Sequence, residues 1–95
     1  MAKEFYELWA STEVDLTRAR QTLPDVATHH EAVREYQEFI DNNELELACD
    51  NLERYAEDHP VSREFWLALR DAAIKMELLD HASRYEHKIS NRDPT

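Results

Sequence analysis

Apolar positions recur every three or four residues along almost the whole chain, the spacing that gathers side chains on one face of an α-helix. The pattern predicts helices at residues 3–22, 29–41, 44–57, 62–78 and 81–90, followed by a polar tail at residues 91–95. The inner faces of the first and fourth helices are expected to include Leu8 and Leu79. No run alternates with the period of two that a strand shows, so we expect a single all-α domain of four or five amphipathic helices.

Polar residues mark the expected helix ends. The first segment is predicted as one helix that ends at Pro24, with a break at Thr12 as the alternative, because Thr12–Asp15 resembles a capping box. Thr28–Glu31 and Asn43–Glu46 show the same pattern at the start of the second and third helices. Asp41-Asn42-Asn43 closes the second helix, where asparagine often replaces glycine in a left-handed cap.

A weak internal repeat of 34 residues is visible when the chain is compared with itself. It aligns Val33 with Leu67, Ile40 with Ile74, Leu45 with Leu79, Ala48 with Ala82, and Pro60 with Pro94. The period resembles that of a tetratricopeptide unit, which is an antiparallel helix pair. Arg70, Ala73 and Glu86 depart from the residues usual in that family. We therefore expect two stacked antiparallel hairpins in a tetratricopeptide-like bundle, with Ala48 and Ala82 at close helix crossings.

The chain contains no glycine, and this excludes several classes of site. Phosphate-binding loops, dinucleotide fingerprints and the nucleophile elbow of α/β-hydrolases all need glycine where a side chain would block the backbone. The single cysteine, Cys49, cannot form an internal disulfide, and it is expected to be a buried structural thiol. No stretch has the length and apolarity of a secretory signal or a membrane span, so we expect a soluble cytoplasmic protein.

Negative charge is concentrated in one part of the chain. Lys and Arg number 11 against 21 Asp and Glu, for a formal net charge of −10. Residues 31–58 hold ten acids and two bases, a net charge of −8, whereas the rest of the chain holds eleven acids and nine bases. Like charges at helical spacing cost about 0.2–0.5 kcal/mol per pair, so the arrangement is unfavourable for the isolated helices. Such a charge repels nucleic acid and anionic lipid and attracts basic proteins.

The acids of the predicted second and third helices fall on narrow stripes. Those of the third helix step by four, three and four residues and so lie within a stripe ~60° wide. A solvated face that only keeps the protein soluble is one interpretation, and a docking surface for a basic partner is the other. We predict the second, with an outward leucine beside the stripe as an apolar anchor, through Glu35, Glu38, Glu46, Leu47, Asp50, Glu53 and Glu57.

No catalytic, metal or cofactor site is expected from the residue pattern. A general acid needs a desolvated pocket, and these carboxylates are expected to face water. Glu77 and His81, at i and i+4, are the best candidate pair for a metal, but no third ligand follows at a known spacing. Trp9 and Trp66 are expected to be core residues.

Residues 35–58 and 65–80 resemble small acidic immunity proteins of bacterial toxin systems, of the Maf and contact-dependent-inhibition kind. The resemblance rests on Asn43-Glu44-Leu45, Ala48, Phe65-Trp66 and Ala72-Ala73, and it covers roughly residues 33–80. Glu46 and Glu77 depart from it, since relatives often have glycine there. The resemblance implies a non-enzymatic protein that neutralises a cognate toxin, often a basic nuclease, by binding it.

Two alternatives remain open at this point. A helical adaptor or scaffold would bind a peptide or dimerise through a groove lined by the second and fourth helices, and its binding would be insensitive to salt. An acidic nucleic-acid mimic would inhibit a DNA-binding protein and would be displaced from it by competing DNA. An enzyme is the least expected class. We expect a monomer or weak dimer that binds neither nucleic acid nor membrane directly.

Overall fold

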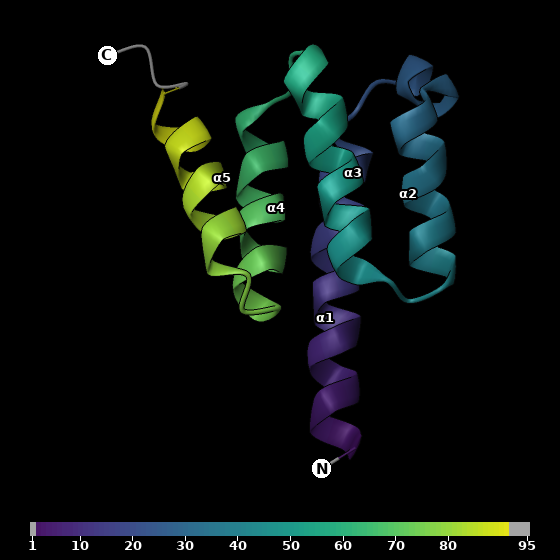
Figure 1. Cartoon of the computed structure of the whole chain (residues 1–95), viewed down its shortest axis with the longest axis vertical. Coiled ribbons are helices and arrows are strands. Elements are labelled where there is room, and N and C mark those ends of the chain that lie inside the picture. The colour runs from purple at the N-terminus through teal and green to yellow at the C-terminus, as the bar shows by residue number, and fades with distance from the viewer. Residues whose placement is uncertain (1, 92–95) are drawn as a thin grey trace.

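The computed structural model describes residues 2–91, and the side chains of residues 7–90. This part of the chain is helical and contains no strand, so the all-α prediction is confirmed (Figure 1). Its elements are α1 (Ala2–Gln21), the short 3-10 helix η1 (Asp25–His29), α2 (Glu31–Asp41), α3 (Leu45–Asp58), α4 (Arg63–Lys75) and α5 (Leu79–Asn91). Of the predicted tail at residues 91–95, Asn91 is instead the last residue of α5, and residues 92–95 lie outside the described residues. No helix in the described range is long and apolar enough to cross a membrane.

Successive α-helices run in opposite directions, as Figure 1 shows, and pack as two hairpins. One hairpin is α2 with α3, and the other is α4 with α5. α1 joins them, because it packs along α4 and also contacts α3. The predicted antiparallel hairpins are therefore present, and α4 lies between α1 and α5.

Each hairpin has its own turn, and the two turns are of the same type although neither contains glycine. Asn43 and Glu77, which are 34 residues apart, both have left-handed backbones, with φ of 60° and 59°. After each of them an N–H donates to a carbonyl five residues back, from Glu44 to Phe39 at 2.8 Å and from Leu78 to Ala73 at 2.9 Å. This is the Schellman termination of a helix. The left-handed asparagine cap predicted within residues 41–43 is confirmed and lies at Asn43, and the repeat places a second left-handed cap at Glu77.

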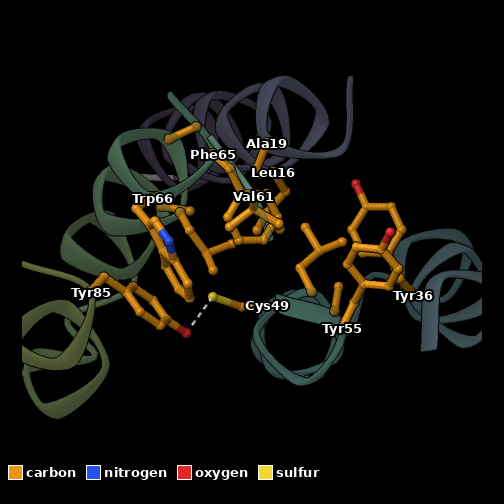
Figure 2. Packing of buried hydrophobic residues seen from close by; sticks show 14 of the residues in the cluster. Leu16, Ala19, Tyr36, Cys49, Tyr55, Val61, Phe65, Trp66 and Tyr85 are labelled. Atoms are coloured by element: carbon orange, nitrogen blue, oxygen red, sulfur yellow. Dashed lines mark hydrogen bonds between the residues drawn. The ribbon is translucent and has the colours of Figure 1, made fainter. Parts of the chain in front are cut away.

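The core lies between α1 and α3, with α4 and α5 closing one side (Figure 2). Leu16, Leu52, Phe65 and Leu69 are fully buried there. Trp66 is also buried, as predicted, and Trp9 packs against the cluster while partly exposed. α4 contributes most to the core because both of its sides are covered.

Two apolar residues predicted to face inward do not. Leu8 is 49% exposed and Leu79 is 72% exposed. Leu79 corresponds to Leu45 in the 34-residue repeat, and Leu45 is buried. The two leucines differ in exposure because α1 contacts α3, which carries Leu45, whereas no described helix contacts α5 in the equivalent way.

α1 is one unbroken helix, as predicted, and the buried hydroxyl of Thr12, the alternative point for a break, donates to the carbonyl of Leu8 at 2.8 Å. The N-caps predicted for α2 and α3 are wrong. α2 is capped by the imidazole of His30 instead of Thr28, so it begins later than predicted. Glu44 precedes α3 without a side-chain cap, because Asn43, the predicted cap, has the left-handed backbone of the Schellman turn instead of the extended backbone of an N-cap. At these two helices the sequence pattern found the break but not the capping residue.

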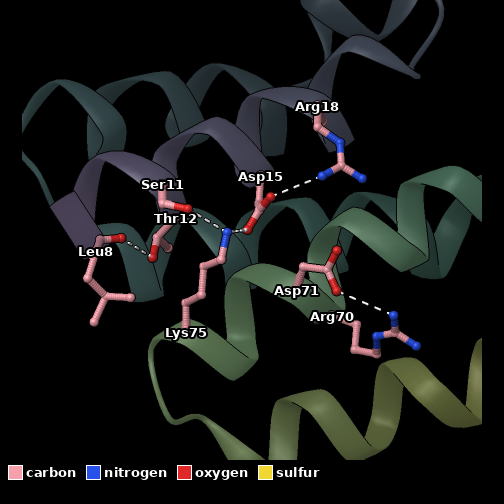
Figure 3. Close-up of polar contacts among 8 residues, drawn as sticks. All are labelled: Leu8, Ser11, Thr12, Asp15, Arg18, Arg70, Asp71 and Lys75. Atoms are coloured by element: carbon pink, nitrogen blue, oxygen red, sulfur yellow. Dashed lines mark hydrogen bonds and ion pairs between the residues drawn. The ribbon is translucent and has the colours of Figure 1, made fainter.

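A buried carboxylate joins α1 to α4, and the apolar pattern gave no sign of it. Asp15 is 3% exposed, and the ammonium of Lys75 lies 2.7 Å from its Oδ2 (Figure 3). Lys75 also donates to the hydroxyl of Ser11 at 2.6 Å, and Arg18 donates to Asp15 Oδ1 at 3.1 Å. A buried charge is tolerated when it is paired in this way.

We expect Glu77→Gly to stabilise the protein by about 0.5–1.5 kcal/mol, because relief of the left-handed strain exceeds the entropic cost of glycine. Equilibrium denaturation in urea measures the change. Asn43→Gly is the matched control and should have a smaller effect, since asparagine tolerates this conformation better. A loss of stability in Glu77→Gly would show that the turn is not strained.

Candidate functional site

The candidate site is the outer face of α3, between α2 and α5. Buried Leu45, Ala48, Leu52 and Tyr55 fix the inner side of this helix. Helical geometry then turns the opposite side, which carries the predicted acids, toward solvent. Leu47 is 44% exposed on this side, as predicted.

Three of the predicted contact acids pair with basic side chains within the protein. Arg54 of α3 donates to Glu35 of α2 at 2.8 Å. The two other pairs join α3 to α5: Asp50 lies 2.7 Å from His81 Nε2, and Glu53 accepts two hydrogen bonds from Arg84 at 2.9 and 2.8 Å. These acids therefore hold the three helices together, whatever else they contact.

Glu53 does not face water, which corrects the prediction that all stripe carboxylates are solvated. Its side chain is 14% exposed, and besides Arg84 it accepts a hydrogen bond from the hydroxyl of Tyr85 at 3.1 Å. Burial alone would raise the pKa of Glu53, but the hydrogen bond and charge of Arg84, with the Tyr85 hydroxyl, outweigh it. The net pKa is lowered, so Glu53 stays ionised.

Cys49 lies behind this pair as a buried structural thiol, as predicted. Its Sγ is 3.3 Å from the hydroxyl of Tyr85, the contact drawn in Figure 2. Burial raises the pKa of the Cys49 thiol to about 12 and also raises the pKa of Tyr85. The thiol is therefore protonated at neutral pH and unsuited to nucleophilic chemistry.

The remaining acids of residues 31–58 are exposed and have no ion pair among the described residues. They are Glu31, Glu38, Asp41, Glu44, Glu46, Glu57 and Asp58. We call these seven residues the free acidic surface. Three of them, Glu38, Glu46 and Glu57, belong to the predicted contact set. Of the two bases in this stretch, Arg54 is occupied by Glu35, so little positive charge offsets the surface.

Glu77 and His81, the pair considered for a metal, do not share a helix, because Glu77 lies in the turn before α5. His81 instead faces Asp50, which is 31 residues away in the sequence. His30 and His59 gather around Tyr55, with ring centroids 5.1 and 4.2 Å from the tyrosine ring.

The sequence pattern missed the contribution of α5 to the site. His81 and Arg84 lie one turn apart, the spacing that matches Asp50 and Glu53 on the facing helix. The only signal for this pairing was the equal spacing of opposite charges at a separation of 31 residues.

Comparisons of this chain with protein-family models, curated proteins and solved structures find no match. The resemblance to toxin-immunity proteins and the tetratricopeptide-like period remain predictions from the sequence. Function must therefore be inferred from the geometry of the α3 face.

We expect Glu53→Gln to lower the free energy of unfolding by about 1–2 kcal/mol at pH 7, because Arg84 loses its ionised acceptor. A lowered pKa in the folded state means that this stabilisation is present above the ordinary value of 4.5 and is lost as pH falls through the lower folded pKa. The difference in free energy of unfolding between wild type and Glu53→Gln should therefore shrink as the pH falls.

Chemical denaturation at a series of pH values measures this difference. Glu57→Gln is the matched control, because Glu57 is exposed one turn further along the same stripe, and it should change stability by less than about 0.5 kcal/mol at every pH. Equal effects of the two substitutions would contradict the structural role of Glu53.

Proposed function

We propose that this protein is an immunity protein that neutralises a bacterial toxin in the cytoplasm by stoichiometric binding. The cognate toxin is a basic protein, such as a nuclease, and it docks on the acidic face formed by α2 and α3. The observation that carries the proposal is the free acidic surface, seven exposed carboxylates in one helical hairpin that form no ion pair with any described residue. The sequence resemblance to immunity proteins supports the same function.

The physical argument is electrostatic complementarity. A nuclease needs a positive cleft to hold phosphates, and a dense array of carboxylates is attracted to such a cleft. Complementary charge increases the association rate and fixes the orientation of the partners. An exposed apolar side chain next to a charged surface adds contact area that charges alone do not provide, and Leu47 lies beside the acidic stripe on α3.

The internal ion pairs divide the predicted contact residues into two groups. Glu38, Glu46 and Glu57 are free to meet a partner, together with Leu47. Asp50 is 43% exposed and can take part from the edge of its pair with His81. Glu35 and Glu53 are positioning residues, because they hold α2 and α5 against α3. A charge reversal at Glu53 would disturb folding and is unsuitable as a binding test.

The adaptor alternative has less support. It expects a groove lined by α2 and α4, whereas α4 packs between α1 and α5. A pocket of about 370 Å³ lies elsewhere, between α1, the α2–α3 turn and the end of α4, with Leu8, Met76 and Leu45 among its lining residues. Partner binding at that pocket would be insensitive to salt, which separates the two functions.

The test uses the protein encoded next to this chain's own gene as the candidate toxin. Expressed alone in bacteria it should arrest growth, and co-expression of this chain should restore growth. The triple variant Glu38→Lys, Glu46→Lys, Glu57→Lys should fail to restore growth. Its affinity for an inactivated toxin should fall by about tenfold or more, chiefly through slower association.

A second triple variant, Glu7→Lys, Asp25→Lys, Glu64→Lys, is the matched control. It changes the net charge by the same amount at exposed acids outside residues 31–58. It should protect as well as wild type. An equal loss of protection in both variants would mean that only the overall charge matters. Protection by the first variant would show that the toxin does not bind the proposed face. If competing DNA displaces this chain from the toxin, while the growth arrest that the toxin causes is unchanged, the result would favour the nucleic-acid mimic.

A further inference from the structure

Three potential metal ligands converge where α5 lies against α3. Glu46 and Asp50 are one helical turn apart on α3, and His81 reaches the same point from α5. Each offers one ligand atom, and these three atoms all lie within 4.8 Å of one another. We propose that Glu46, Asp50 and His81 form a binding site for a divalent transition-metal ion of the zinc type.

Side-chain contacts between α5 and α3 bring the three ligands together. The four-residue spacing of Glu46 and Asp50 places both carboxylates on the same side of α3. His81 is 16% exposed on its side chain, and its ring meets Tyr85 edge-on at a centroid distance of 6.2 Å. The imidazole therefore stays near the carboxylates, and little conformational entropy is lost when an ion binds.

The spacing of the donors suits a small ion. Zinc binds imidazole nitrogen and carboxylate oxygen at about 2.0–2.2 Å, so neighbouring ligands in a tetrahedral site are roughly 3.3 Å apart. His81 Nε2 and Asp50 Oδ1 are 2.7 Å apart in a hydrogen bond, so they separate slightly as the ion replaces the proton between them. Glu46 is exposed and moves inward by a side-chain rotation. Water takes the fourth position.

The donor set selects the class of metal. One imidazole and two carboxylates favour zinc and its transition-metal neighbours over calcium, which takes six to eight oxygen ligands. A dication also neutralises the two carboxylates. Arg84, the cation that interacts with Asp50, is held by both oxygens of Glu53 and does not fill the site. The ion would join α3 to α5 beside the free acidic surface.

Isothermal titration with zinc chloride, in a buffer that does not chelate, tests the proposal on the complete protein. We expect wild type to bind with a dissociation constant below about 100 μM. His81→Gln and Asp50→Asn should each weaken binding by at least about 10- to 100-fold, the loss that removal of even a hydrogen-bond partner of a metal ligand causes. Zinc should also raise the melting temperature of wild type more than that of either variant.

His87→Gln is the matched control, because His87 lies on the same helix and is exposed. It should leave zinc affinity unchanged. NMR adds a readout that does not depend on the variants: the imidazole signals of His81 should shift on addition of zinc before those of His30 and His59. Equal affinity of wild type and His81→Gln would overturn the site, as would a first shift at His30 and His59. Both substituted proteins can be checked for helix content by circular dichroism.

Discussion

The contact of Arg84 with Glu53 is the interaction on which the candidate face depends. It connects α5 to α3 through two hydrogen bonds, at a place where these helices otherwise meet through polar side chains. The Tyr85 hydroxyl contacts both Glu53 and the buried Cys49, so it connects the ion pair to the core. The position of α5 fixes His81 beside Asp50 as well. Without this contact the acids of α3 would repel one another on an unsupported helix surface.

The same contact explains why the acidic stripe is not uniform. Helical geometry alone places Glu46, Asp50, Glu53 and Glu57 in a common sector of α3. The neighbouring helix divides them along the helix axis, because Asp50 and Glu53, in the middle of the stripe, pair with side chains of α5, whereas Glu46 and Glu57, at its two ends, are exposed. The stripe therefore combines two functions: its middle stabilises the fold, and its ends carry charge that has no ion pair among the described residues. The exposed carboxylates can contact a partner only because the paired carboxylates already hold α3 in place within the chain.

The sequence predicted the class of fold and the helix pairs, since the apolar period and the 34-residue repeat are properties of the chain itself. It also predicted a left-handed asparagine cap within residues 41–43, which the structure places at Asn43. It could not predict that Leu79 is exposed while Leu45 is buried, because that depends on where α1 packs. Asp15, Lys75, His81 and Arg84 were missed for a related reason. Their roles come from contacts between distant helices, and local periodicity does not contain that information.

Nuclear magnetic resonance mapping of the bound complex tests the central claim, that a basic partner docks on the outer face of α3. The backbone amide signals of Glu46, Leu47 and Glu57 are predicted to shift most when an inactivated toxin is added. Those of Val14 and Arg18, exposed on α1, are predicted to stay in place. Larger shifts at Val14 and Arg18, with an unperturbed α3, would contradict the account.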